Sequence, residues 1–237
     1  MSLTARIAEN LAAVRQRIAA ACGRAGRDPA DVTLVAVTKY AQIEWIEALL
    51  SVGEIELGEN RPQQLAARAA LFPATVHWHL IGPLQRNKAN LAVRHAELVH
   101  SVDSSRLLPA LDTEAASTGR KVRVLLEVNL SGEEQKHGFG KDELEATFDS
   151  LHGHPHVSIE GLMTMAAYTD DPEAARPTFR ELRLLRDRLQ LRCPAGVELR
   201  CLSMGMSGDF EPAIEEGATL VRIGSALWEG LEAVTAS

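Results

Sequence analysis

The sequence has few cysteines and no long apolar run. Its three cysteines, Cys22, Cys193 and Cys201, are odd in number and form no C-x-x-C pair, which favours a reducing compartment over a disulfide scaffold. No stretch approaches the ~20 apolar residues that a membrane-spanning helix needs. Residues Met1 to Arg17 carry charges between their apolar positions, whereas a signal peptide has an unbroken apolar centre. We therefore expect a soluble, cytoplasmic protein with no membrane partner.

An excess of positive charge is also missing. Lys and Arg number 25 against 32 Asp and Glu, a net charge of −7. Because nucleic-acid binding needs a basic surface that displaces counterions, this balance argues against a nucleic-acid partner. One local basic stretch, formed by Arg86, Lys88, Arg94 and His95, is interpreted as a solvated helix face, with a patch for an anionic partner as the alternative.

Short apolar runs alternate with helical stretches along the 237 residues. The first helix is predicted over Leu3–Ala21, where apolar residues recur at three- and four-residue steps before Gly23 and Gly26. Further helices are predicted at Ile43–Val52, Gln63–Leu71, Asp142–Leu151 and Glu173–Leu191. The predicted strands are Val32–Thr38, Glu54–Glu59, Val76–Gly82, Leu98–Val102, Val122–Asn129, Val157–Met165, Glu198–Met204 and Leu220–Ser225.

This alternation predicts an α/β fold in which crossover helices join parallel strands. A closed barrel and an open doubly wound sheet both fit. Eight strands, and no G-x-G-x-x-G turn after the first, favour a single (β/α)8 TIM-type barrel with an extra N-terminal helix. We predict one domain over 1–237, with the helix in 1–26 and the barrel in 32–228. Because only the short tail Ala226–Ser237 follows the last strand, the N-terminal helix is expected to pack on the barrel's outer wall or base.

The functional site of such a barrel lies where its strands end. Lys39 ends the first predicted strand, where burial would lower the pKa of its amine and favour Schiff-base formation; a lysine that only reaches out into solvent is the alternative. The last two strands run into Ser203–Asp209 and Arg222–Ser225, which are rich in glycine and hydroxyl groups. Loops of this kind after strands seven and eight often bind phosphate. Helix capping by Ser207 and Asp209 is the simpler interpretation.

Other strands end in Asn60, His79 and Asn129. His77 and His79 alternate onto one face of their strand, a pattern that a metal site could use. The other strand ends do not supply a convincing set of further ligands, so we predict no metal.

Several motifs occur in order between about Val32 and Trp228: Val37-Thr38-Lys39, Gly58-Glu59-Asn60, Trp78–Gly82, Leu84–Lys88, Val128-Asn129, Lys136-His137-Gly138, Gly161–Met163, Leu202–Ser207 and Val221–Ser225. This ordered set resembles the pyridoxal phosphate homeostasis protein family. The resemblance implies a single barrel, related to the barrel domain of alanine racemase, that binds pyridoxal 5′-phosphate (PLP).

The resemblance also implies roles for particular residues. Lys39 would hold PLP as an aldimine, and Arg222 would face the pyridine nitrogen. The phosphate would be surrounded by Ser203, Met204, Ser207, Gly224 and Ser225, and the ring and its hydroxyl would be lined by Asn60 and His79. A permanently charged arginine disfavours protonation of the ring nitrogen, because two positive charges would be adjacent. An unprotonated ring is a poorer electron sink.

The function implied is intracellular PLP homeostasis by storage, buffering or delivery, with apo-PLP enzymes as candidate recipients. We expect no substantial catalytic activity, because the related racemases take a second base from an additional all-β domain and this chain stops at Ser237. A low-activity PLP-dependent amino-acid racemase or lyase is the alternative. A Schiff-base aldolase is a third, disfavoured because aldolases normally carry their lysine on a later strand. A monomer or weak dimer is expected.

Overall fold

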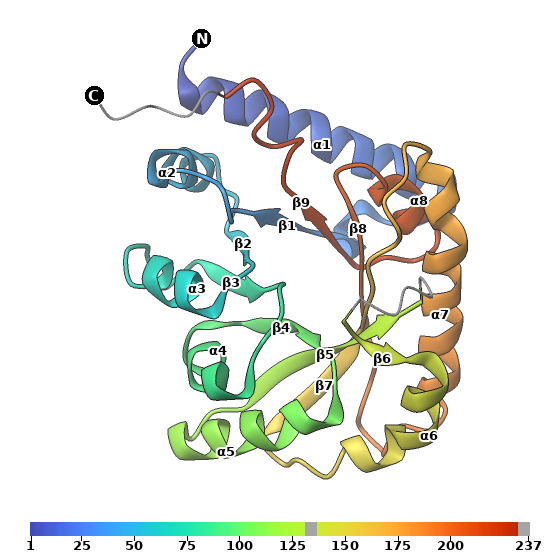
Figure 1. Cartoon of the computed structure of the whole chain (residues 1–237). Helices are drawn as coiled ribbons and strands as arrows, with labels where there is room; N and C mark the ends of the chain where they lie inside the picture. The colour runs from blue at the N-terminus through green and yellow to red at the C-terminus, as the bar shows by residue number, and fades with distance from the viewer. Residues whose placement is uncertain (131–136, 232–237) are drawn as a thin grey trace.

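The strands form a closed parallel barrel (Figure 1). The computed structural model describes residues 1–130 and 137–231. In these ranges the strands are β1 (Thr33–Val37), β2 (Glu56–Glu59), β3 (His77–Leu80), β4 (Leu98–Val102), β5 (Val122–Asn129), β6 (Phe139–Gly140), β7 (Val157–Met163), β8 (Cys201–Met206) and β9 (Leu220–Ile223). The ring runs β1-β2-β3-β4-β5-β7-β8-β9 and closes because β9 pairs with β1, while β6 pairs only with β5. The predicted TIM-type barrel is confirmed.

Helices surround the sheet (Figure 1). They are α1 (Leu3–Ala25), α2 (Ile43–Ser51), α3 (Pro62–Ala69), α4 (Ala89–His95), α5 (Leu108–Thr118), α6 (Lys141–Leu151), α7 (Arg176–Gln190) and α8 (Phe210–Glu215). The described ranges also contain four short 3-10 helices: η1 (Pro29–Asp31), η2 (Arg86–Lys88), η3 (Ser105–Leu107) and η4 (Pro172–Ala175). No helix in the described ranges is both long enough and apolar enough to cross a membrane.

Two apolar cores, one on each side of the sheet, explain why the strands appear in the sequence as continuous apolar runs. On β1, Leu34 and Ala36 belong to the large cluster that includes the helices. Val35 instead belongs to a small cluster with Leu98, Leu125, Met163 and Leu220. Because successive side chains of a strand point to opposite faces, β1 is buried both against the helices and within the barrel.

The N-terminal helix α1 completes the ring of helices. It packs against α8, which precedes β9, and against α2, which follows β1. Asn10 Nδ2 donates hydrogen bonds to the carbonyl oxygens of Leu227 (3.0 Å) and Glu229 (2.9 Å), in the segment after β9. Helix α1 therefore occupies the place of a helix that would follow β9. The predicted packing of this helix on the outer wall is confirmed.

Most predicted strand ends lie within two residues of the observed ones, and two larger differences occur. The seventh strand of the ring, β8, begins at Cys201 rather than Glu198, because the preceding residues bind α7. Leu199 N–H donates to Gln190 Oε1 (2.6 Å), and Arg186 donates to the Leu199 carbonyl oxygen (3.2 Å). The short strand β6 was not predicted, since two residues are too few to show a strand pattern.

Candidate functional site

The backbone around Lys39 is held by side chains from two neighbouring elements. Lys39 lies two residues beyond β1. Trp228 Nε1 donates to the Val37 carbonyl oxygen (2.9 Å), and Gln64 Nε2 on α3 donates to the Lys39 carbonyl oxygen (3.1 Å). Lys39 Nζ lies 5.0 Å from the ring centroid of the exposed Tyr40. The main chain that carries the lysine is therefore fixed at the C-terminal mouth of the barrel.

A buried ion pair reinforces this segment. Arg68 on α3 pairs with Glu59 and also donates to the carbonyl oxygens of Thr38 and Ala41 (2.7 Å to Ala41). Burial raises the pKa of Glu59, and hydrogen bonds from Thr38 and Arg68 only partly oppose that rise. Glu59 thus acts within the Gly58-Glu59-Asn60 motif by fixing the end of β1.

The glycine- and hydroxyl-rich loops after β8 and β9 meet. Ser207 Oγ, after β8, accepts hydrogen bonds from the backbone N–H groups of Gly224 (3.1 Å) and Ala226 (3.4 Å), after β9. Ser225 between them is exposed. Two backbone donors thus point at one oxygen position, an arrangement that suits an anion.

The end of β8 lies directly on α8. Gly205 has φ +91°, and a Cβ there would lie 2.6 Å from Ala213 Cβ and 2.8 Å from Phe210 Cα. Met204 is fully buried and belongs to the apolar cluster that contains Phe210 and Ala213. A contact from Met204 to a phosphate would therefore come from its backbone.

Arg222 lies inside the barrel. Its NH1 group donates to Ser203 Oγ (2.6 Å), and its NH2 group donates to the Thr164 carbonyl oxygen (3.0 Å). Burial lowers the pKa of Arg222 to about 10, although Asp209 and Glu127 act to raise it. The guanidinium therefore stays cationic at neutral pH.

Glu127 on β5 is a candidate that the sequence analysis did not single out. Burial and the nearby Asp103 carboxylate raise its pKa to about 7, against the opposing charges of Arg222 and His137. A carboxyl group with this pKa exchanges its proton near neutral pH, as acid–base groups at functional sites do. The available signal was a charged residue directly after the apolar run Val124-Leu125-Leu126 of the same strand.

His79 makes its contacts inside the barrel. Its Nδ1 lies 2.8 Å from His100 Nε2, and its Nε2 lies 2.7 Å from Glu56 Oε2. His77 Nδ1 lies 2.7 Å from the other oxygen of Glu56, so the two histidines considered as metal ligands share one carboxylate. The role of His79 beside a cofactor ring remains a prediction.

Asn60 lies at the C-terminal mouth, where it lines a cavity of about 510 Å³ together with Pro83, Lys88 and Asp103. A Cβ on Gly82 would come within 2.3 Å of the Asn60 backbone and side-chain oxygens. The close approach of these two loops therefore requires glycine at position 82. A contact from Asn60 to a cofactor ring also remains a prediction.

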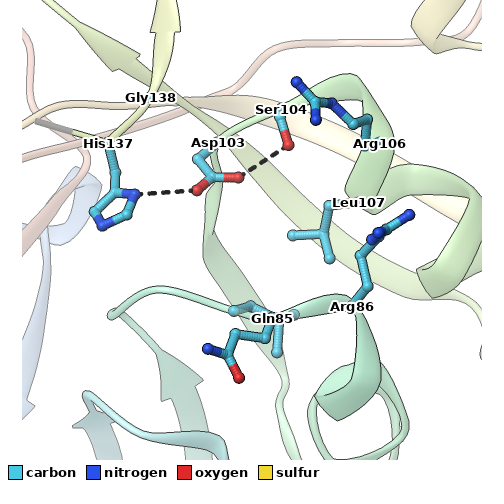
Figure 2. Close-up of a pocket in the computed structure, with 9 residues that line it drawn as sticks. Gln85, Arg86, Asp103, Ser104, Arg106, Leu107, His137 and Gly138 are labelled. Carbon is cyan, nitrogen blue, oxygen red and sulfur yellow. Dashed lines mark hydrogen bonds and ion pairs between the residues drawn. The ribbon is translucent and has the colours of Figure 1, made fainter. Parts of the chain in front are cut away.

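A second cavity of about 520 Å³ adjoins this mouth and is lined by Arg86 and Arg106 (Figure 2). His137 Nδ1 lies 3.5 Å from Asp103 Oδ2, and Ser104 Oγ donates to Asp103 Oδ1 (3.1 Å), as Figure 2 shows. Lys136, in the motif with His137, lies outside the described residues.

The basic stretch spans two consecutive helices. Arg86 and Lys88 belong to η2 and line these two cavities, whereas Arg94 and His95 end α4. Arg86 and Arg94 are exposed, and Lys88 and His95 are half-buried. The interpretation as a solvated helix face, and the alternative of a patch for an anionic partner, remain predictions.

Known proteins resemble this chain over nearly its whole length. The model of the alanine racemase N-terminal domain matches residues 4–231. The pyridoxal phosphate homeostasis protein of Aquifex aeolicus is 42% identical over 221 residues, which cover 93% of this chain and 96% of that protein. The structure of PipY from Synechococcus elongatus with PLP bound has a TM-score of 0.82 and 35% identity, covering 93% of this chain and 99% of PipY.

A more distant likeness concerns the fold alone. Alanine racemase from Bartonella henselae, with covalently bound PLP, has a TM-score of 0.71 at 15% identity, and the match covers 95% of this chain and 58% of the racemase. The identity to the Aquifex protein, together with the match to the domain model, carries the assignment. The chain belongs to the pyridoxal phosphate homeostasis protein family, within the group that shares the alanine racemase N-terminal domain.

Proposed function

We propose that the protein binds PLP at the C-terminal mouth of its barrel and acts in PLP homeostasis. The observation that carries this proposal is the position of two features on neighbouring strands. Strand β1 pairs with β9, with Ala36 beside Ile223. Lys39 lies three positions after Ala36. Gly224 comes directly after Ile223, and its N–H group points at Ser207 Oγ. The main chain that carries the lysine and the loop that we propose to hold the phosphate thus leave neighbouring strands at the same end of the barrel, which supports a site for a phosphorylated aldehyde.

Each residue then has a defined task. Lys39 Nζ condenses with the aldehyde, so that a C=N bond forms and a water molecule leaves. Ser207, Gly224 and Ser225 hold the phosphate. Arg222 faces the ring nitrogen and, as a cation, keeps a second positive charge away from it. When bound, PLP supplies an electrophilic centre, and an unprotonated ring limits its use as an electron sink.

The covalent bond is tested by spectroscopy and mass. Wild-type protein incubated with PLP should turn yellow, lose that band on borohydride reduction and carry the cofactor mass on the peptide containing Lys39. Lys39→Ala should abolish the reducible adduct while keeping some binding through the phosphate loops. Lys121→Ala is the matched control, because that exposed lysine precedes β5 at the opposite end of the barrel. A reducible adduct that persists in Lys39→Ala would refute the assignment.

Storage and delivery are separated from catalysis by two assays. The loaded protein should transfer PLP to an apo-PLP enzyme, measured as regained activity of that enzyme. Incubation with single L-amino acids should give little turnover. Robust racemisation or lyase activity would instead favour the alternative of a PLP-dependent enzyme. We expect a monomer or weak dimer in sedimentation at increasing concentration.

A further inference from the structure

Five polar side chains form a continuous hydrogen-bonded chain through the barrel. Beyond the His79 contacts given above, His100 Nδ1 lies 2.8 Å from Ser203 Oγ, which in turn accepts from Arg222. The chain therefore runs Glu56–His79–His100–Ser203–Arg222. His100 and Ser203 are fully buried, and His79 and Arg222 are 3% and 4% exposed. Polar groups this deeply buried are costly unless every donor finds an acceptor.

The residues at the two ends of the hydrogen-bonded chain have fixed roles, one as a donor and the other as an acceptor. A guanidinium has only donors, so Arg222 can only donate to Ser203 Oγ. At the other end Glu56 faces both His77 and His79. Burial alone would raise the pKa of Glu56, but hydrogen bonds from these two histidines outweigh burial and lower it. Glu56 is therefore a carboxylate, which only accepts.

The carboxylate end lies at the N-terminal mouth of the barrel. Glu56 lines a cavity of about 360 Å³ whose wall includes the first residues of six strands: Thr33, Glu56, His77, Leu98, Cys201 and Leu220. Arg123, which also lines this cavity, pairs with Glu97 and Glu160. Glu56 instead directs one oxygen inward to His79.

We propose that His100 is a positioning residue for Arg222 and that all the hydrogen bonds of this chain run in one direction. Ser203 accepts from Arg222 and donates its hydroxyl proton to His100 Nδ1. His100 then donates from Nε2 to His79 Nδ1, and His79 donates from Nε2 to Glu56. Both imidazoles are neutral, and every proton in the chain has an acceptor.

The hydrogen-bonded chain gives Arg222 a single orientation. Val35, which lies opposite Arg222 on β1, belongs to an apolar cluster with Leu125 and Met163. The Ser203 hydroxyl oxygen can accept a hydrogen bond from the guanidinium only if its own proton points elsewhere. His100 Nδ1 accepts the hydrogen bond from that hydroxyl. Burial, together with the charge of Arg222, holds the pKa of His100 well below its ordinary value, in agreement with a neutral acceptor. His100 thus acts on Arg222 through Ser203.

The direction of the chain is tested first on the wild-type protein without PLP. Nitrogen-15 NMR of histidine side chains distinguishes the two neutral tautomers from the imidazolium. We expect His100 and His79 to carry one proton each, on Nε2, at pH 7. A proton on Nδ1 of His100, or an imidazolium at His79, would overturn the proposal. This readout does not depend on the proposed function.

The effect on Arg222 is tested with PLP and therefore rests on the proposed function. His100→Leu removes both hydrogen bonds at similar volume. We expect the PLP dissociation constant to rise roughly ten-fold, as for the loss of a hydrogen bond to a charged group, and the absorption band of bound PLP to shift. His100→Gln should bind within about three-fold of wild type, because a carboxamide offers one acceptor and one donor, as neutral imidazole does.

Glu97→Gln is the matched control, because Glu97 lines the same N-terminal cavity but does not belong to the hydrogen-bonded chain. It should leave the PLP affinity and the absorption band of bound PLP unchanged. If His100→Leu does not fold, Ser203→Ala replaces it with the same expectation. Wild-type affinity and spectrum in His100→Leu would overturn the positioning role. A wild-type protein that binds no PLP would overturn the proposed function, and the tautomers would still decide the direction of the chain.

Discussion

Glu127→Gln should change how the stability of the PLP-free protein depends on pH. Glu127 is 3% exposed, and the pKa of its carboxyl group in the folded protein is about 7, against 4.5 for the ordinary group. Between these values the folded state keeps a proton that the unfolded state has released. The stability that this proton provides is present below pH 4.5 and is lost as the pH rises through 7. Glutamine resembles the protonated form at every pH.

The magnitude follows from the two pKa values. A difference of about 2.5 pH units, at about 1.4 kcal/mol each, gives about 3 kcal/mol. Glu127→Gln should therefore be close to wild type in unfolding free energy near pH 4.5 and more stable by about 3 kcal/mol at pH 8. For a chain of this length that corresponds to roughly 6–12 °C in melting temperature.

The assay is urea unfolding of both proteins at several pH values from 4.5 to 8, with the difference taken at each pH so that other titrating groups cancel. Glu47→Gln, at an exposed position on α2, is the control and should give a difference independent of pH. Asp103→Asn should reduce the effect, because the Asp103 charge helps to raise the pKa of Glu127. A Glu127→Gln difference that stays constant from pH 4.5 to 8 would refute the reasoning.

Three further changes test the support of the site and the fold. Arg68→Met should lower the unfolding free energy by about 3–5 kcal/mol in urea, because it leaves the buried Glu59 carboxylate without its cation; adding Glu59→Gln should recover part of the loss, and an additive double mutant would contradict the pairing. Gly205→Ala should cost more than about 1 kcal/mol, whereas Gly208→Ala, with open space around its Cβ, should be nearly neutral; equal effects would argue against the close packing on α8. Deleting residues 1–26 should lower the melting temperature, since α1 covers α2 and α8; an unchanged value would show that the barrel does not need this helix.

Local patterns in the sequence determined the elements of this fold. The predicted strands Leu98–Val102 and Val122–Asn129 match β4 and β5 in full, because a strand buried on both faces carries its own apolar signature. The C-terminal ends of the strands follow from the sequence to within two residues, which is enough to place Lys39 and Gly224 at the C-terminal mouth. The strand count and the missing dinucleotide-binding turn together favoured a barrel over an open sheet.

Which polar groups meet inside the barrel was decided only by the tertiary structure. His100 contacts His79, 21 positions away, and Ser203, 103 positions away. In the sequence, each of these residues is a polar side chain on a different predicted strand, and nothing in its neighbourhood relates it to the others. Whether it is a lone buried group or one member of a chain depends on the relative register of strands around the closed sheet. That register is fixed by pairings between distant segments, such as β1 with β9, and no local pattern encodes it.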